Sequence, residues 1–91
     1  MNSPTYKLEY SNQALKQLRK LNQTTARRLV LWLDRNVANK RNPRLSGQAL
    51  TGEMNGCWRY RVGDYRIIVL IRDKELVILC LSIGHRKEIY R

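Results

Sequence analysis

The chain has 91 residues, 43% of them hydrophobic, with 18 Lys and Arg against 7 Asp and Glu and a formal net charge of +11. This length fits one domain over residues 1–91 with one small core. The aromatic and β-branched content is too high for a disordered tail, and the sequence contains no apolar run of about 18 residues that would predict a membrane span. The opening residues lack the basic-then-apolar pattern of a secretory signal, so a soluble cytosolic protein is expected.

The excess of positive charge predicts a polyanionic partner. A domain of this size with a charge of +11 attracts polyanions and associates with them faster. Nucleic acid is the first candidate and an acidic protein is the second, and the two are compatible. A net charge of +11 is larger than a domain of this size needs for solubility alone.

The two cysteines, Cys57 and Cys80, both fall in apolar strand-like runs. A disulfide between them would suit a secreted protein, but no other feature indicates export, so we interpret both as reduced and buried. The single histidine and the two distant cysteines lack the spacing of metal ligands. Neither a metal nor a cofactor is expected.

The first half of the chain predicts one strand and two helices. Residues 5–10 alternate polar and apolar side chains, which is typical of a strand. Ser11 is a good N-cap for a first helix that ends at Asn22, and Thr24 or Thr25 can cap the second. The apolar stripes are formed by Ala14, Leu15, Leu18 and Leu21 in the first helix and by Leu29, Val30, Leu33 and Val37 in the second. Each helix is amphipathic and too small to stand alone. Trp32 and Trp58 are interpreted as core residues.

The second half predicts a loop and then three strands. Pro43 ends the second helix, because proline disfavours a helical residue before it, and the glycine-rich segment 44–56 is expected to be a loop. The strands are expected over residues 57–62, 65–72 and 75–83. Two-residue loops at 63–64 and 73–74 link them. The predicted fold class is α+β, with two N-terminal helices on one face of a small, mostly antiparallel four-stranded sheet in the order β-α-α-β-β-β.

Three arginines fall in CWRYRVGDYRI, residues 57–67. Side chains alternate along a strand, so Arg59 and Arg61 share one face. A two-residue loop at 63–64 places Arg61 directly across from Arg66. Opposed like charges destabilise a sheet unless an anion or an acid lies between them, and Asp64 is the only acid nearby. The pattern therefore predicts an anion-binding face.

The second loop determines where His85 lies. A two-residue loop at 73–74 would put Leu81 across from Arg66 and carry His85 on the same face, with Arg86 beside it. A one-residue change of register would move His85 to the other face. Arginine forks match phosphate oxygens, and histidine exchanges a proton near neutral pH. Together they suit RNA cleavage, in which a 2′-hydroxyl attacks its neighbouring phosphate while cations neutralise the developing charge. The pattern contains no carboxylate pair and no metal-ligand motif, so a metal-independent reaction is expected.

Three segments resemble one known family. They are GQALTG at 47–52, GCWRYRVGDYRIIVLI at 56–71 and SIGHRKEIYR at 82–91, and they resemble the RelE/ParE superfamily of bacterial toxins, in particular its RelE-like branch. The chain length and the order of elements agree with the resemblance, which covers nearly the whole chain. It implies a cytoplasmic mRNA interferase that cuts messenger RNA in the A site of the 70S ribosome by attack of the 2′-hydroxyl. It also implies a cognate antitoxin that holds the enzyme inactive.

The resemblance also implies roles for individual residues. Arg59 and Arg61 match two basic residues that serve the catalytic site, and Arg66 matches an arginine that contacts the scissile phosphate. Arg86 matches a further arginine that stabilises the transition state. Tyr90 matches a terminal tyrosine that orients the reacting nucleotide.

The sequence departs from the RelE pattern at two places. The pattern has lysines at the positions of Arg59 and Arg61, and an arginine scarcely releases its proton, so His85 is expected to act as general base or acid. The interval from Gly84 to Tyr90 is also shorter than in the pattern.

The basic charge also bears on the antitoxin and on the alternative functions. We expect an acidic or amphipathic antitoxin that lies over the helices or the basic face. Two alternatives to RNA cleavage are a ParE-type inhibitor of DNA gyrase and a non-catalytic nucleic-acid-binding co-repressor. The co-repressor would use the charge but would not need His85.

Overall fold

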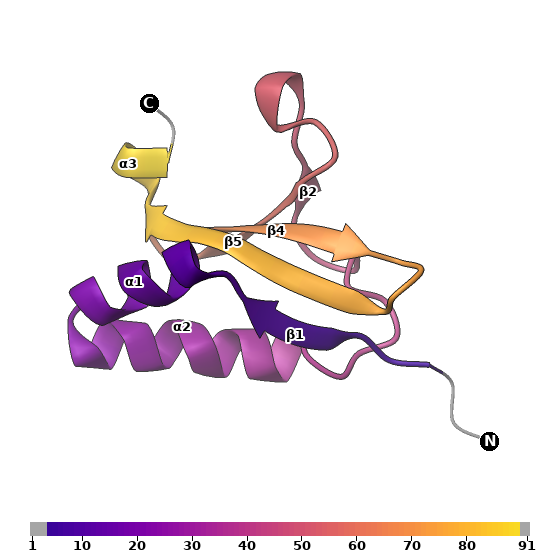
Figure 1. Ribbon diagram of the computed structural model, residues 1–91. Coiled ribbons are helices and arrows are strands. Elements are labelled where there is room, and N and C mark those ends of the chain that lie inside the picture. Colours follow the sequence, from indigo (N-terminus) through magenta and orange to yellow (C-terminus); the bar gives the residue numbers. More distant parts are fainter. Residues whose placement is uncertain (1–3, 90–91) are drawn as a thin grey trace.

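The computed structural model describes residues 4–89, which form two layers (Figure 1). The elements in chain order are β1 (Lys7–Tyr10), α1 (Asn12–Lys20), α2 (Gln23–Asn36), β2 (Gln48–Ala49), the 3-10 helix η1 (Gly52–Met54), β3 (Trp58–Val62), β4 (Tyr65–Arg72), β5 (Val77–His85) and α3 (Arg86–Ile89). The strands form one sheet in the order β1-β5-β4-β3-β2, in which β1 runs parallel to β5 and the other pairs are antiparallel. Helices α1 and α2 lie side by side against one face of the sheet. The α+β class and the helix placement are confirmed, but the described residues form five strands where four were expected.

The additional strand is β2, which lies in the segment expected to be a loop. Gln48 pairs with Arg59 and Ala49 pairs with Trp58. Gly47 precedes this pairing with a φ of +89°, and a Cβ at Gly47 would lie 2.4 Å from the Arg59 carbonyl oxygen. The glycine that indicates a loop is thus the residue that lets the chain approach β3. A two-residue strand leaves too short an alternation to be read from the sequence.

The helix caps explain where α1 and α2 begin. The Ser11 hydroxyl accepts a hydrogen bond from the Ala14 amide at 3.1 Å, which confirms the predicted cap of α1. Asn22, and neither of the two threonines, caps α2. Its side-chain oxygen accepts from the amides of Thr24 at 2.8 Å and Thr25 at 3.3 Å. One asparagine side chain therefore satisfies two N-terminal donors that would otherwise need separate partners.

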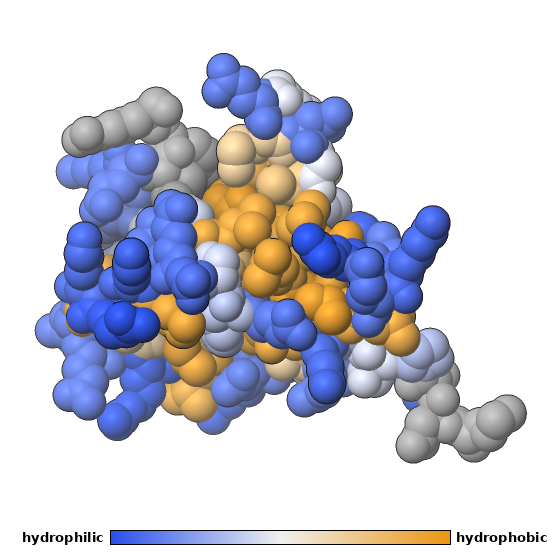
Figure 2. All heavy atoms as spheres, viewed as in Figure 1, coloured by the Kyte–Doolittle hydropathy of each residue, from blue (hydrophilic) through white to orange (hydrophobic). Residues whose placement is uncertain are grey.

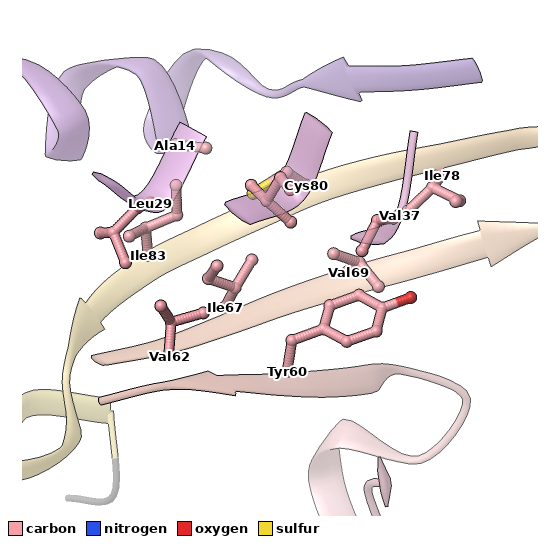
Figure 3. Close-up of a cluster of buried hydrophobic side chains, with 11 residues drawn as sticks. Ala14, Leu29, Val37, Tyr60, Val62, Ile67, Val69, Ile78, Cys80 and Ile83 are labelled. Carbon is pink, nitrogen blue, oxygen red and sulfur yellow. The ribbon is translucent and has the colours of Figure 1, made fainter. Parts of the chain in front are cut away.

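The core lies between the two helices and the sheet (Figure 3). Its buried members are Ala14, Leu29, Leu33, Val37, Tyr60, Val62, Ile67, Val69, Ile78, Cys80 and Ile83. Full burial of one such aliphatic or aromatic side chain is worth about 1.5–3 kcal/mol relative to exposure, so this cluster dominates the stability of the fold. Trp32 and Trp58 were expected in the core and are half-buried at its margin.

The two cysteines are free thiols, as expected. Cys80 is buried in the core, and burial raises the pKa of its thiol to about 12. Cys57 is half-buried rather than buried. At neutral pH the Cys80 thiol therefore stays protonated and behaves as a small apolar side chain.

The first predicted hairpin is confirmed. Val62 pairs with Tyr65, and Arg61 stands directly across from Arg66. The turn between them has a φ of +59° at Gly63, the left-handed conformation that tight hairpin turns require. The face shared by Arg59 and Arg61 is therefore the one predicted from the sequence.

The second hairpin differs from its prediction in two ways. The turn has four residues, because Arg72 pairs with Val77, and β5 continues to His85. The register also shifts between Ile68 and Val69, which leaves Leu81 as an extra residue in β5. The longer turn by itself would keep His85 on the arginine face, since it moves the register by an even number of residues. The single extra residue reverses the faces, so His85 pairs with Tyr65 on the helix side of the sheet.

The sheet face away from the helices carries half-buried leucines. Leu70 and Leu79 pair with each other and alternate with buried core residues, and Leu81 lies at the bulge. Figure 2 shows an apolar area over β4 and β5 ringed by hydrophilic side chains. Within residues 4–89, no helix has the length and apolar character needed to cross a membrane.

Candidate functional site

Four basic residues lie where the β3–β4 hairpin meets the end of β5. Arg61, Arg66 and Gly84 form one row across three neighbouring strands, and Gly84 adds no side chain to it. The Arg86 amide donates to the Asp64 carbonyl at 2.8 Å, so α3 starts against the turn of the hairpin. We call Arg61, Arg66, His85 and Arg86 the turn-end cluster. The hairpin turn and the bulge in β5 together decide its composition.

Arg66 is the buried member of this cluster, with 4% of its surface exposed. Its Nη1 atom donates to the carbonyl oxygens of Gly63 at 3.0 Å and Tyr65 at 2.9 Å. These bonds hold the turn and offset part of the cost of burying a guanidinium. Arg61 directly opposite is exposed. The two arginines thus differ in role: Arg66 fixes the turn and adds positive charge, and Arg61 is available to a ligand.

Arg59 is oriented by a residue that the sequence did not single out. It is half-buried, and its Nη2 atom donates to the Gln48 side-chain oxygen at 2.6 Å. Gln48 belongs to β2, and this strand, which was expected to be a loop, places Gln48 opposite Arg59. Gln48 lies in the GQALTG segment that carries the family resemblance, but no role was predicted for it.

His85 lies on the other side of the sheet end from the arginine row. Its ring meets the ring of Tyr65 edge-on at 5.6 Å, and its Nδ1 atom accepts from the Lys87 amide at 3.2 Å. In this arrangement the neutral imidazole carries its proton on Nε2. The ring lines a cavity of about 180 Å³ together with Gln17 and Lys20 of α1. The expectation that His85 shares the arginine face is therefore wrong, and the two groups meet only around the end of the sheet.

Two side chains of the α1 segment hold the last part of β5. Strand β1 pairs with β5 only as far as Cys80. Beyond it the Ser11 hydroxyl donates to the Leu81 carbonyl at 3.0 Å, and the Gln17 side-chain oxygen accepts from the Ile83 amide at 2.6 Å. These two side chains continue the hydrogen bonding that a neighbouring strand would supply. Gln17 therefore positions the strand that ends in His85, although nothing in its sequence context indicated this.

A polar clamp lies at the opposite end of the sheet. Asp73 accepts from the Tyr6 hydroxyl at 2.6 Å and from both terminal nitrogens of Arg44 at 3.0 Å. These hydrogen bonds, first from Arg44 and then from Tyr6, lower the pKa of Asp73 to about 2. The Arg44 guanidinium also lies 6.0 Å from the centre of the Trp58 ring. The clamp secures the segment that leads into β2 and is distant in the fold from the turn-end cluster.

Two further expectations concern Tyr90 and metal ions. Tyr90 lies outside the described residues. Within residues 4–89, no group of three His, Cys, Asp or Glu side chains is placed to hold a metal ion.

Known proteins share this sequence pattern. A family model described as ParE toxin of type II toxin-antitoxin system, parDE, matches residues 8–90. The mRNA interferase toxin RelE of Escherichia coli strain K12 is 30% identical over 89 residues, which cover 93% of this chain and 90% of that protein. Toxin RelG of Mycobacterium tuberculosis is 35% identical over 51 residues, which cover 56% of this chain and 59% of that toxin.

Solved structures share the fold. A chain of the toxin-antitoxin complex RelBE2 from Mycobacterium tuberculosis superposes with a TM-score of 0.78 at 25% identity, covering 93% of this chain and 95% of that one. The isolated Escherichia coli RelE toxin gives a TM-score of 0.71 at 28% identity, with 89% and 84% covered. The family model and the shared fold thus define a toxin of a type II toxin–antitoxin system. The chain belongs to the RelE/ParE superfamily of these toxins, in its RelE-like branch.

Proposed function

We propose that the protein is an mRNA interferase that cuts messenger RNA in the A site of the 70S ribosome, without a metal ion. The observation that carries the proposal is the row in which Arg61 stands exposed across from buried Arg66, beside the start of α3. Opposed like charges are costly in a sheet, and an anion placed against them offsets that cost. The similarity to a protein named mRNA interferase RelE supports RNA as the source of the anion.

In this proposal the arginines bind the scissile phosphate. Arg61 and Arg86 are exposed and present planar forks to the phosphate oxygens. Arg66 contributes positive charge from its buried position. Its hydrogen bonds to the β3–β4 turn keep Arg61 paired opposite it. Arg59, held by Gln48, extends the positive surface along β3. When the 2′-hydroxyl attacks, negative charge grows on the phosphate, and preorganised cations stabilise it without further rearrangement.

His85 is assigned the proton transfer. Because His85 does not share the face of the arginine row, it would approach the reacting group from the other side of the sheet end. With Nδ1 accepting from the Lys87 amide, Nε2 carries the proton and can donate a hydrogen bond to a phosphate oxygen. Acting as a base at Nε2 requires the other tautomer, and acting as an acid requires the imidazolium. Both forms carry a proton on Nδ1, which breaks the bond to Lys87 and loosens the first turn of α3. We retain Tyr90 as the group that orients the nucleotide, on the strength of the family resemblance.

We also propose where an antitoxin binds. Solved relatives of this fold include complexes with antitoxins, which supports an antitoxin as partner. The leucine area over β4 and β5 is apolar at its centre and hydrophilic at its rim (Figure 2). An amphipathic segment matches both features, because its apolar side covers the leucines and its polar side meets the hydrophilic rim. Acidic side chains in that segment suit a chain with a net charge of +11.

Inhibition of DNA gyrase is the second candidate, favoured by the match to the ParE family model. Both activities are measured with one preparation: purified protein is added to ribosomes programmed with a message, and to gyrase with plasmid DNA. We expect a message cut in the A site that leaves a cyclic phosphate end, and unchanged supercoiling. An intact message with stalled gyrase would overturn the assignment. Nucleic-acid binding with neither effect would favour the co-repressor.

A further inference from the structure

Trp32 lies between two basic hollows on the surface. The first has a volume of about 240 Å³ and is lined by Trp32, Ser46, Gly47, Gln48, Arg59 and Arg61. The second has a volume of about 250 Å³ and is lined by Arg28, Leu31, Trp32, Arg35 and Asn36. Trp32 is common to both, and the charged residues among these lining residues are all arginines. The result is a strip that contains four arginines, with one tryptophan at its centre.

The indole of Trp32 is held firmly but not covered. It is half-buried, and its ring packs against Tyr60 with centroids 5.6 Å apart and a tilt of 55°. Tyr60 is itself fully buried and donates its hydroxyl proton to the Pro43 carbonyl at 2.5 Å. A ring supported from below in this way is a rigid platform, which loses little conformational freedom when a second ring stacks on it.

The strip is continuous with the turn-end cluster. A Cβ at Gly63 would lie 3.3 Å from a terminal nitrogen of Arg28, so this guanidinium reaches the β3–β4 turn. Arg61 lines the first hollow and also belongs to the arginine row. A chain of phosphates bound at the turn-end cluster would therefore continue past Trp32.

Sites that bind single-stranded nucleic acid combine arginines with aromatic rings, because the cations follow the phosphates and the bases stack on the rings. Each hollow is smaller than the roughly 300–1,000 Å³ of a drug-sized site, which suits one base or one phosphate better than a protein helix. We propose that Trp32, Arg28, Arg59 and Arg61 form a ribonucleotide subsite, in which a base flanking the cleaved position stacks on Trp32. The identity of the ligand as RNA rests on the proposed function.

The experiment uses tryptophan fluorescence. The chain has two tryptophans, so Trp58→Phe leaves Trp32 as the only reporter and Trp32→Phe leaves Trp58. The probe is a short RNA with 2′-O-methyl ribose throughout, which binds without being cut, and poly-glutamate serves as the acidic control. We expect RNA to quench the Trp58→Phe protein strongly and the Trp32→Phe protein weakly, and poly-glutamate to quench neither. Equal quenching of both variants by RNA, or strong quenching of Trp32 by poly-glutamate, would overturn the subsite.

Affinity gives an independent readout. We expect Trp32→Leu to weaken binding of the methylated RNA by roughly 5- to 150-fold, the range for loss of one stacked base. Trp58→Leu should weaken it less, because the Trp58 indole only donates to the Ser46 carbonyl at the rim of the first hollow. Unchanged affinity in a folded Trp32→Leu protein would contradict the proposal. Trp32→Phe keeps a smaller aromatic ring for stacking and should lose less affinity than Trp32→Leu. If RNA stacks on Trp32 but the ribosomal message stays uncut, the subsite is supported and the proposed nuclease activity is contradicted. If the message is cut but Trp32→Leu binds RNA with unaltered affinity, the nuclease activity is supported and the subsite is contradicted.

Discussion

Arg61 and Arg66 are the same residue type in the same row, yet their surroundings give them different tasks. Arg66→Ala removes a buried donor from two turn carbonyls and leaves a cavity, so we expect a loss of about 1–3 kcal/mol in the free energy of unfolding. Arg61→Ala removes an exposed side chain, and its unfolding free energy should change by less than about 0.5 kcal/mol. Cleavage on programmed ribosomes should nevertheless fall by roughly 100-fold or more in Arg61→Ala. Thermal denaturation and cleavage rates of both variants test this, and the opposite pattern would contradict the division of roles.

His85 has two possible contributions, a cap and a proton. Its Nδ1 atom accepts from the Lys87 amide, and a glutamine side chain can supply that acceptor without transferring a proton. We therefore expect both His85→Ala and His85→Gln to reduce cleavage by about 100- to 10,000-fold. Single-turnover rates on programmed ribosomes measure this. Recovery of most activity in His85→Gln would show that the residue acts only by capping α3.

Asp73 makes stability depend on pH at the acidic end. Its pKa in the folded protein is about 2, below the value of about 3.9 of an unfolded chain, so its contribution is complete above about pH 4 and is lost as the pH falls towards 2. Because the Arg44–Asp73 pair is well exposed, the contribution should not exceed about 1 kcal/mol. We expect Asp73→Asn to lower the Tm by a few degrees at pH 6 and by almost nothing near pH 2. A Tm difference that stays constant across this range would rule out the clamp as its source.

At the scale of elements, β2 can pair with β3 only because Gly47 has no side chain. A methyl group there would lie 2.4 Å from the Arg59 carbonyl oxygen and 2.5 Å from the Trp58 indole nitrogen. Gly52 also has a positive φ but has open space around its Cβ position, so Gly52→Ala is a matched control for backbone strain alone. We expect Gly47→Ala to lower the Tm more than Gly52→Ala does, and to reduce cleavage by releasing Gln48 from Arg59. Equal effects of the two substitutions on Tm would mean that the close approach is unimportant.

The two hairpins show how far element geometry follows from sequence. Gly63 at the first position of a two-residue loop specifies one turn type, and the register of Arg61 and Arg66 follows from it. Asp73 and Lys74 specify no turn type, and the bulge at Leu81 depends on how β5 packs against β4 and α1. One unpredictable residue there was sufficient to move His85 to the other face. The arginine row could be predicted, and the placement of the histidine could not.

At the scale of the whole molecule, long-range contacts determine the residues that sequence reading missed. Gln17 acts on β5 across 66 positions, and Gln48 acts on Arg59 through a strand of two residues. Trp32 follows the apolar pattern of α2 and was expected in the core, where it does pack against Tyr60. Its additional exposure to two hollows depends on how α2 lies against the β3 edge. Periodicity predicts which side of a helix faces inward, and it does not predict how much of a large ring stays uncovered.

The open architecture of the sheet gives the molecule two separate surfaces. Helices α1 and α2 cover one face of the sheet, and the leucine area on the other face is available to a partner (Figure 1, Figure 2). The turn-end cluster lies at the end of the sheet between them. A net charge of +11 draws polyanions to the whole surface, so the identity of the productive ligand depends on the chemistry at that end.

In the proposed mechanism, the turn-end cluster promotes attack by a 2′-hydroxyl on its neighbouring phosphate. The most direct measurement compares two messages on programmed ribosomes, identical except for a single 2′-deoxyribose at the nucleotide whose hydroxyl would attack. The all-ribose message should be cut at that position and leave a cyclic phosphate, and the deoxy message should stay intact there. Cleavage of the deoxy message at the same position and rate would contradict the mechanism.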